Sequence, residues 1–130
     1  MIKALRVIVI IFGIGLVASG VLTAIFPQQS LDLTGLEGLT DTVRLWMGVA
    51  GAAWVAIGAW GIIAAAGNLL KNLVIVKVMI TKGLLATIVM LIVMLQDYVS
   101  FSDVAVMLVP DAVFAILLLI CYPWKGQASS

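Results

Sequence analysis

Apolar positions along the chain form four long, continuous runs. They cover residues 7–26, 45–66, 73–95 and 104–122. Each run is close to the roughly 20 residues that an α-helix needs to cross about 30 Å of hydrocarbon. A membrane β-barrel would instead show segments of about 10 residues with alternating polarity. The pattern therefore predicts four transmembrane helices, in one domain that extends over residues 1–130.

The composition agrees with a lipid environment. Hydrophobic residues make up 65% of the chain and charged residues 10%, whereas soluble domains carry about 25% charged residues. Short connections make successive helices antiparallel, so the expected fold class is all-α, an integral membrane up-down-up-down four-helix bundle. Lys3 and Arg6 precede the first run as in a signal peptide, but the run exceeds the usual 7–15 residues. We therefore expect a retained helix.

Charged residues sort by connection. Bases flank the first run, the second connection and the end of the fourth run: Lys3, Arg6, Lys71, Lys77 and Lys125. The other two connections hold Asp32, Glu37, Asp41, Asp97 and Asp103, with Arg44 as their one base. Under the positive-inside rule, both termini are predicted to be cytoplasmic. Trp46 and Trp124, at opposite faces, are predicted interface anchors.

The connections carry helix-end signals. Pro27 is expected to end the first helix, because proline cannot continue the hydrogen-bond ladder. The leucine-rich segment that follows suits a connector at the headgroup level. Thr40 or Asp41 is a predicted N-cap for the second helix. Gly67 and Asn68 are predicted to form a left-handed C-cap after it.

Small residues in the second run predict close helix packing, because lipid is as apolar as leucine and burial alone does not associate membrane helices. This run is expected at the bundle centre or against another subunit, with the first run as its closest partner. The predicted packing positions are Gly15, Ser19, Thr23, Gly20 and Ala24 in the first run, and Gly48, Ala52, Ala53, Ala56, Gly61 and Ala65 in the second.

Two ionisable residues lie deep within the apolar runs. Asp111 is eight residues beyond Asp103, about 12 Å along a helix, and Lys82 is fourteen residues before Gln96, about 21 Å. Such groups are costly in hydrocarbon, so a Lys82–Asp111 pair is favoured, with Arg44 as an alternative partner for Asp111 and no salt bridge as a third possibility.

Pro110 precedes Asp111 and is a predicted helix kink. It leaves the carbonyl of Val106 without its usual N–H donor, and Lys82, Thr81 or Thr87 are candidate donors in its place. The whole feature is predicted to be a polar knot between the third and fourth helices. Without a second buried carboxylate for a proton relay, the structural interpretation is preferred.

The chain lacks the residues that several kinds of chemistry require. The chain has no histidine and one cysteine, Cys121, which excludes histidine-ligated metals, thiolate clusters and internal disulfides. No nucleophile lies beside a base, so an enzyme is not expected and no catalytic or metal-binding residue is proposed. The net charge of +1 gives no basic patch for nucleic acid.

The first half of the chain resembles small four-helix membrane proteins of the DoxX-like and DUF4345-like type. The resemblance rests on RVIVIIFGIGLVASGVLTAIFPQQSLDLTGL, a glycine-rich helix closed by Phe-Pro before a leucine loop, and on RLWMGVAGAAWVAIGAWGIIAA, where an arginine opens a second glycine-rich span. It implies a prokaryotic plasma-membrane protein, in some cases associated with quinol-oxidising oxidases. It transfers no catalytic residues, and it does not extend to Lys82 or to Pro110 and Asp111.

Three functional hypotheses follow. The first is a non-catalytic accessory subunit, packed within a larger respiratory or photosynthetic membrane complex or as a homo-oligomer. The second is a small transporter or channel that uses Lys82 and Asp111. The third is a quinone-linked oxidoreductase partner of the DoxX type. No cofactor is predicted, and a bound lipid, quinone or pigment is left open.

Overall fold

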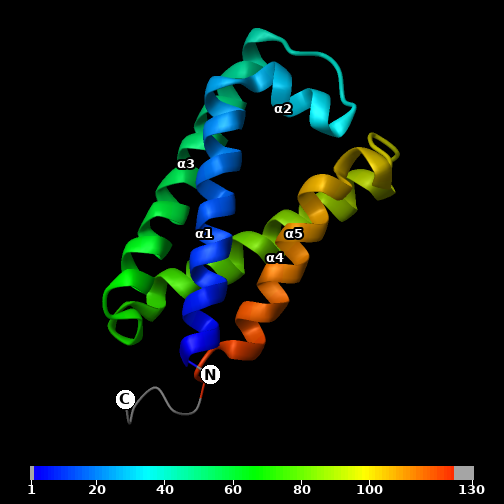
Figure 1. The fold of residues 1–130 in the computed structure, drawn as a ribbon. Helices are drawn as coiled ribbons and strands as arrows, with labels where there is room; N and C mark the ends of the chain where they lie inside the picture. Colours follow the sequence, from blue (N-terminus) through cyan, green and yellow to red (C-terminus); the bar gives the residue numbers. More distant parts are fainter. Residues whose placement is uncertain (1, 125–130) are drawn as a thin grey trace.

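The structure, a computed structural model, describes residues 2–124, and all its regular elements in that range are helices (Figure 1). They are α1 (Ile2–Ile25), α2 (Pro27–Thr34), α3 (Asp41–Ala66), the 3-10 helix η1 (Leu69–Asn72), α4 (Leu73–Leu95) and α5 (Phe101–Cys121). Four helices are long and apolar enough to cross a membrane, α4 together with η1 among them. The predicted all-α class and its four long apolar helices are confirmed.

The helix ends explain where the predicted runs were too short. α3 begins at its N-cap Thr40, whose Oγ1 accepts a hydrogen bond from the Val43 N–H at 3.2 Å. α5 begins at Ser100, whose N–H donates to Asp103 Oδ2 at 2.9 Å in a capping box. These first turns are polar, so hydropathy alone leaves them out of the helices that they start.

Two connections differ from the prediction. Pro27 does end α1, but it then occupies the first position of α2, where its missing N–H costs nothing. The prediction of a left-handed C-cap at Gly67 and Asn68 is wrong, because both residues have negative φ, −96° and −103°. The Asn68 side chain instead accepts the Lys71 N–H at 3.2 Å, which starts η1 and leads directly into α4.

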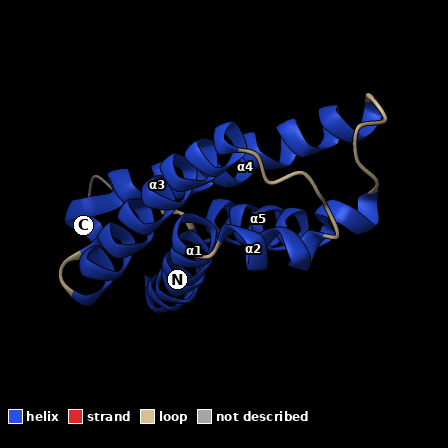
Figure 2. Ribbon diagram, turned by 90° about the horizontal axis from the view of Figure 1, so that it is seen from above, coloured by secondary structure: helices blue, strands red, loops and turns tan. Residues whose placement is uncertain are grey.

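The long helices form two antiparallel hairpins, α1 with α3 and α4 with α5 (Figure 1). The hairpins approach each other near the N-terminus and diverge toward the opposite end, so the molecule is a wedge and not an evenly packed bundle. At the open end, α2 crosses from the first hairpin to the beginning of α5, as the view from above shows (Figure 2).

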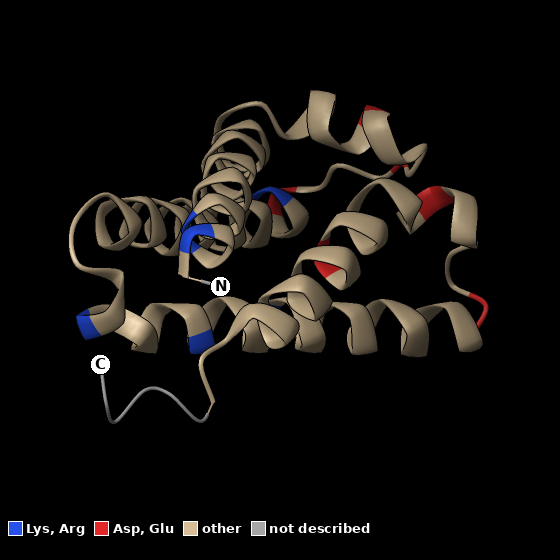
Figure 3. Ribbon diagram, turned by 60° about the horizontal axis from the view of Figure 1, so that its bottom comes forward, with Lys and Arg blue, Asp and Glu red and all other residues tan. Residues whose placement is uncertain are grey.

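The two ends of the wedge carry opposite charge (Figure 3). The closed end, called the basic end here, has Lys3, Arg6, Lys71 and Lys77. The open end, called the acidic end, has Asp32, Glu37, Asp41, Asp97 and Asp103 together with Arg44. The charge separation predicted from the sequence is therefore present in the fold. Lys125, which the sequence also places with the bases, lies outside the described residues.

The hydrophobic core lies at the basic end, where the two hairpins meet. α3 contributes the small side chain of Ala65, which is fully buried. The largest fully buried side chains come from α1, η1, α4 and α5: Leu5, Val9, Leu69, Ile75, Val76, Met79 and Leu118. Where the core ends, the rings of Phe12 on α1 and Phe114 on α5 stack with centroids 4.9 Å apart. This stacked pair joins the first hairpin to the second.

Backbone contact between glycines joins α1 to α3. A Cβ atom at Gly20 would lie 2.5 Å from the carbonyl oxygen of Gly51, and one at Gly58 would lie 2.5 Å from that of Gly13. Both pairs repeat at a spacing of seven residues, which keeps one seam facing the partner along the two helices. The prediction that the first helix is the closest partner of the glycine-rich second span is thus confirmed.

The particular positions predicted for this packing are mostly wrong within the chain. Gly15, Ser19, Ala52, Ala53 and Ala56 are exposed, and a Cβ atom at Gly15 or Gly48 would meet nothing within 4 Å. Stripes of small residues at four-residue spacing lie beside the true seam, because a seven-residue repeat places other positions at the helix contact. Gly20, Gly61 and Ala65 are confirmed as buried, and a Cβ atom at Gly61 would lie 2.7 Å from Met79 Cε.

Candidate functional site: a cavity between the hairpins

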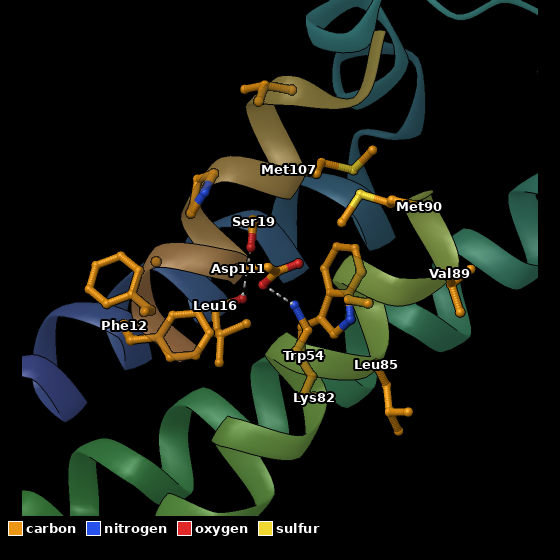
Figure 4. A pocket seen from close by; sticks show the side chains of 15 residues that line it. Phe12, Leu16, Ser19, Trp54, Lys82, Leu85, Val89, Met90, Met107 and Asp111 are labelled. Carbon is orange, nitrogen blue, oxygen red and sulfur yellow. Dashed lines mark hydrogen bonds and ion pairs between the residues drawn. The ribbon is translucent and has the colours of Figure 1, made fainter. Parts of the chain in front are cut away.

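A cavity of about 550 Å³ occupies the space where the hairpins begin to diverge (Figure 4). All four long helices line it, with the Phe12–Phe114 stack among the lining side chains next to the core. Its polar groups are the side chains of Ser19, Lys82 and Asp111 and the indole nitrogen of Trp54, and the rest of the wall is apolar. Cavities of this volume and character commonly hold small organic ligands.

Lys82 and Asp111 form an ion pair in this cavity. Lys82 Nζ on α4 lies 2.7 Å from Asp111 Oδ1 on α5, and the two side chains are 15% and 11% exposed. The predicted pair is confirmed. The alternative in which Arg44 is the partner is wrong, because Arg44 lies exposed near the acidic end of α3. The alternative without a salt bridge is also wrong.

Trp54 completes the surroundings of the ammonium group. Lys82 Nζ lies 4.9 Å from the centroid of the Trp54 ring, a distance at which the negative face of the ring stabilises a cation. Figure 4 shows this indole beside the Lys82 side chain, with Asp111 approaching from the opposite helix. The ammonium is therefore held by a carboxylate on one side and by an aromatic ring on another.

The second oxygen of Asp111 is differently placed. Lys82 binds Oδ1, and the structure gives Oδ2 no hydrogen-bond partner among residues 2–124. Every fully buried side-chain oxygen in that range has a hydrogen-bond partner. Oδ2 has none, so it is not fully buried, and because Asp111 lines the cavity, this oxygen is accessible from it. The carboxylate therefore offers an acceptor to whatever occupies the space.

The part of the prediction that concerns Pro110 is corrected in one respect. Thr81 Oγ1 donates to the carbonyl of Lys77 at 2.8 Å, and Thr87 Oγ1 donates to that of Gly83 at 2.7 Å. Both threonines thus satisfy carbonyls of their own helix and not the carbonyl of Val106. α5 continues as a helix through Pro110, and both Pro110 and Val106 lie at the cavity wall.

A second cavity of about 370 Å³ lies between α2 and the outer part of α3. It contains a hydroxyl pair, Thr23 Oγ1 and Ser30 Oγ, 3.1 Å apart. Trp46, a predicted interface anchor, is exposed at this end of the molecule and lines the cavity. Trp54 and Met107 line both cavities, so these two side chains form the partition between them.

Other predicted positions lie apart from the cavity. Trp124 is exposed at the basic end, where its indole N–H donates to the carbonyl of Leu119 at 3.0 Å, so Trp46 and Trp124 do lie at opposite ends. Cys121 is half-buried near the same end. Within residues 2–124, no three histidine, cysteine or acidic side chains gather in a way that would hold a metal ion.

The sequence pointed to the ion pair but not to the cavity around it. From the sequence, Trp54 is a tryptophan deep within its span that could contact lipid, a bound quinone or pigment, or a neighbouring helix, and no pattern distinguishes Phe12, Phe114 and Met107. In an apolar span each of these side chains is as compatible with lipid as with a ligand. The seven-residue glycine repeat was the available signal, because it fixes which face of α3 carries Trp54.

Comparison with known proteins adds no relative: neither a protein family, nor a curated protein, nor a solved structure matches this chain. The resemblance to DoxX-like and DUF4345-like proteins stays a prediction from the first half of the sequence.

Proposed function

We propose that the chain is a membrane protein of the prokaryotic plasma membrane that crosses the bilayer four times, with both termini in the cytoplasm. Four helices of sufficient length and apolarity support the crossings. The collection of bases at one end and acids at the other supports the orientation through the positive-inside rule. The prokaryotic membrane is what the resemblance to DoxX-like proteins implies.

Within that membrane, the proposed function is to bind a small, lipid-soluble molecule in the cavity between the hairpins. The observation that carries this proposal is the Lys82–Asp111 pair, which lies in an apolar cavity of about 550 Å³. An ion pair that only joined two helices would be expected to be enclosed by protein, because facing a cavity gives such a pair no additional contact. Here one carboxylate oxygen is presented to the cavity, as recognition of a ligand requires.

The nature of the wall supports binding over conduction of ions. Apart from the pair, Ser19 and the indole nitrogen, the described lining is apolar, and an ion pathway needs a succession of polar groups. Exposed wall residues include Ser19 on α1, Leu85 on α4 and Pro110 on α5. A ligand dissolved in the bilayer would therefore enter sideways, and a membrane quinone belongs to this class of ligand.

Fluorescence quenching of Trp54 tests the proposal. Trp46, Trp60 and Trp124 are replaced by phenylalanine, and the protein in lipid nanodiscs is titrated with ω-bromododecanol, whose bromine quenches indole on contact. Quenching of Trp54 is expected to saturate. A matched protein that keeps only Trp60, which is 45% exposed and outside both cavities, should show a non-saturating rise. Non-saturating curves for both proteins would contradict ligand binding.

An accessory role in a larger membrane complex is a second proposal, and one observation favours it. Gly48, Ala52 and Ala56 follow one another at four-residue spacing on α3, and none of them packs within the chain as predicted. Small residues at this spacing allow another helix to approach closely. An Ala52→Leu substitution is expected to release a co-purifying membrane partner without lowering the stability of this chain, and retention of the partner would contradict the role.

A further inference from the structure

The charge arrangement in the cavity indicates the class of ligand, on the premise that the cavity binds one. We propose that the ligand is a lipophilic carboxylic acid, which enters as the neutral acid, transfers its proton to Asp111 and binds Lys82 through its carboxylate. The proposal concerns the ion pair, the ring of Trp54 and the free oxygen of Asp111.

Charge balance is the first step. Of the groups that line the cavity, α4 supplies Lys82 and α5 supplies Asp111, while the lining residues of α1 and α3 carry no charge. The cavity therefore holds one positive and one negative charge. A third charge, uncompensated in an apolar space, is strongly unfavourable. An ionic ligand can be held only if one of the two resident groups becomes neutral at the same time.

The contacts of the two groups indicate which one changes. The Trp54 ring, 4.9 Å from Lys82 Nζ, stabilises the ammonium and provides nothing for a neutral amine. Asp111 has no comparable second anchor for its charge, since Lys82 occupies Oδ1 and Oδ2 faces the cavity. The cation is thus the group that stays charged, and the carboxylate is the group that accepts a proton. An anionic ligand fits this arrangement, and a cationic ligand does not.

The exchange is balanced in atoms and charge. The O–H bond of the incoming acid breaks, and its proton forms an O–H bond at Asp111 Oδ2. The Lys82 ammonium then donates to the ligand carboxylate in place of Asp111 Oδ1, while the new Asp111 hydroxyl also donates to the ligand. The cavity is neutral before and after, and the neutral acid crosses the surrounding hydrocarbon without carrying a net charge.

The pH dependence of binding separates this exchange from simple burial of an alkyl chain. The protein that keeps only Trp54 is titrated with ω-bromododecanoic acid and with ω-bromododecanol, and the Trp60 protein corrects for partitioning into the bilayer. Above the pKa of the free acid, one proton must be taken up with each bound anion. The apparent affinity for the acid is then expected to fall about tenfold per pH unit, whereas that for the alcohol stays constant.

Asp111→Asn provides the sharpest comparison, because the amide resembles the protonated carboxyl group in shape and neutrality. The variant should bind the anion without a proton, so its affinity for the acid stays flat as pH rises. Asp97→Asn is the matched control, since Asp97 lies in the turn before α5 with φ of 61°, a conformation that asparagine accepts. It is expected to retain the tenfold dependence.

Each outcome decides between the two proposals. Suppose that the alcohol binds saturably and that the acid binds without taking up a proton. This result would contradict the proposed carboxylic acid ligand and would leave the proposed ligand-binding function of the cavity intact. Absence of saturable quenching by either compound would contradict both. Tighter binding of ω-bromododecylamine than of the acid would also overturn the assignment. If Asp111→Asn does not fold, proton uptake by the unsubstituted protein, followed with an indicator dye, still decides the question.

Discussion

Gly20 on α1 and Gly51 on α3 meet backbone to backbone, so that a Cβ atom on Gly20 would lie 2.5 Å from the carbonyl oxygen of Gly51. A backbone oxygen in the middle of a helix cannot move aside as the end of a side chain can. The same geometry recurs one heptad away at Gly13 and Gly58. These two contacts hold the first hairpin together and thereby set the direction in which Trp54 projects.

Alanine at Gly20 or Gly58 is therefore expected to lower the free energy of unfolding by about 1–3 kcal/mol, the usual range for overpacking. Thermal unfolding in detergent would measure the effect as a fall in Tm. Gly15→Ala and Gly48→Ala are matched controls, because a Cβ atom at either position meets nothing within 4 Å. Equal shifts for all four variants would show that the α1–α3 seam lies elsewhere.

Hydropathy and charge were enough to predict the four long helices and the separation of bases from acids. The cost of an isolated charge in hydrocarbon was enough to predict that Lys82 pairs with Asp111. The wedge was not predictable in this way, because the apolar runs are apolar all round and give no preferred face. For the same reason the cavity, its partition at Trp54 and Met107, and the helical form of α2 emerged only from the structure.

The ion pair is expected to show strong energetic coupling. Lys82→Met leaves Asp111 without its partner at a largely buried position, and we expect a loss of about 3 kcal/mol in unfolding free energy. The double variant Lys82→Met with Asp111→Leu removes both charges and should recover most of that loss. A double-mutant cycle from thermal unfolding measures the coupling. Additive effects of the two single substitutions would contradict a direct pair.

Orientation in the membrane is tested by labelling. In a Cys121→Ala background, single cysteines are introduced as Ser100→Cys at the acidic end and Lys71→Cys at the basic end, both at exposed positions. A membrane-impermeant maleimide applied to intact cells should label the first variant. The second should react only after permeabilisation. The reverse pattern would place the termini outside the cytoplasm.

The partition between the two cavities is expected to limit ligand length. Met107 lines both spaces, so Met107→Ala should join them and shift the preference toward longer alkyl chains. A series of ω-bromo alcohols titrated against the Trp54 protein measures this preference as the chain length of highest affinity. Met94→Ala, on a part of α4 that lines neither cavity, is the control. An unchanged preference in Met107→Ala would show that the ligand does not reach the partition.

Ligand binding to Gly15→Phe compared with Gly48→Phe tests the cavity most directly. Both glycines have open space at the Cβ position, but Gly15 lines the cavity and Gly48 lines neither cavity. A phenyl group at position 15 would occupy the ligand's volume, so saturable quenching of Trp54 by ω-bromododecanol should be lost in that variant while Tm is maintained. Gly48→Phe should bind as the unsubstituted protein does. Equal affinity in both variants would contradict a binding site between the hairpins.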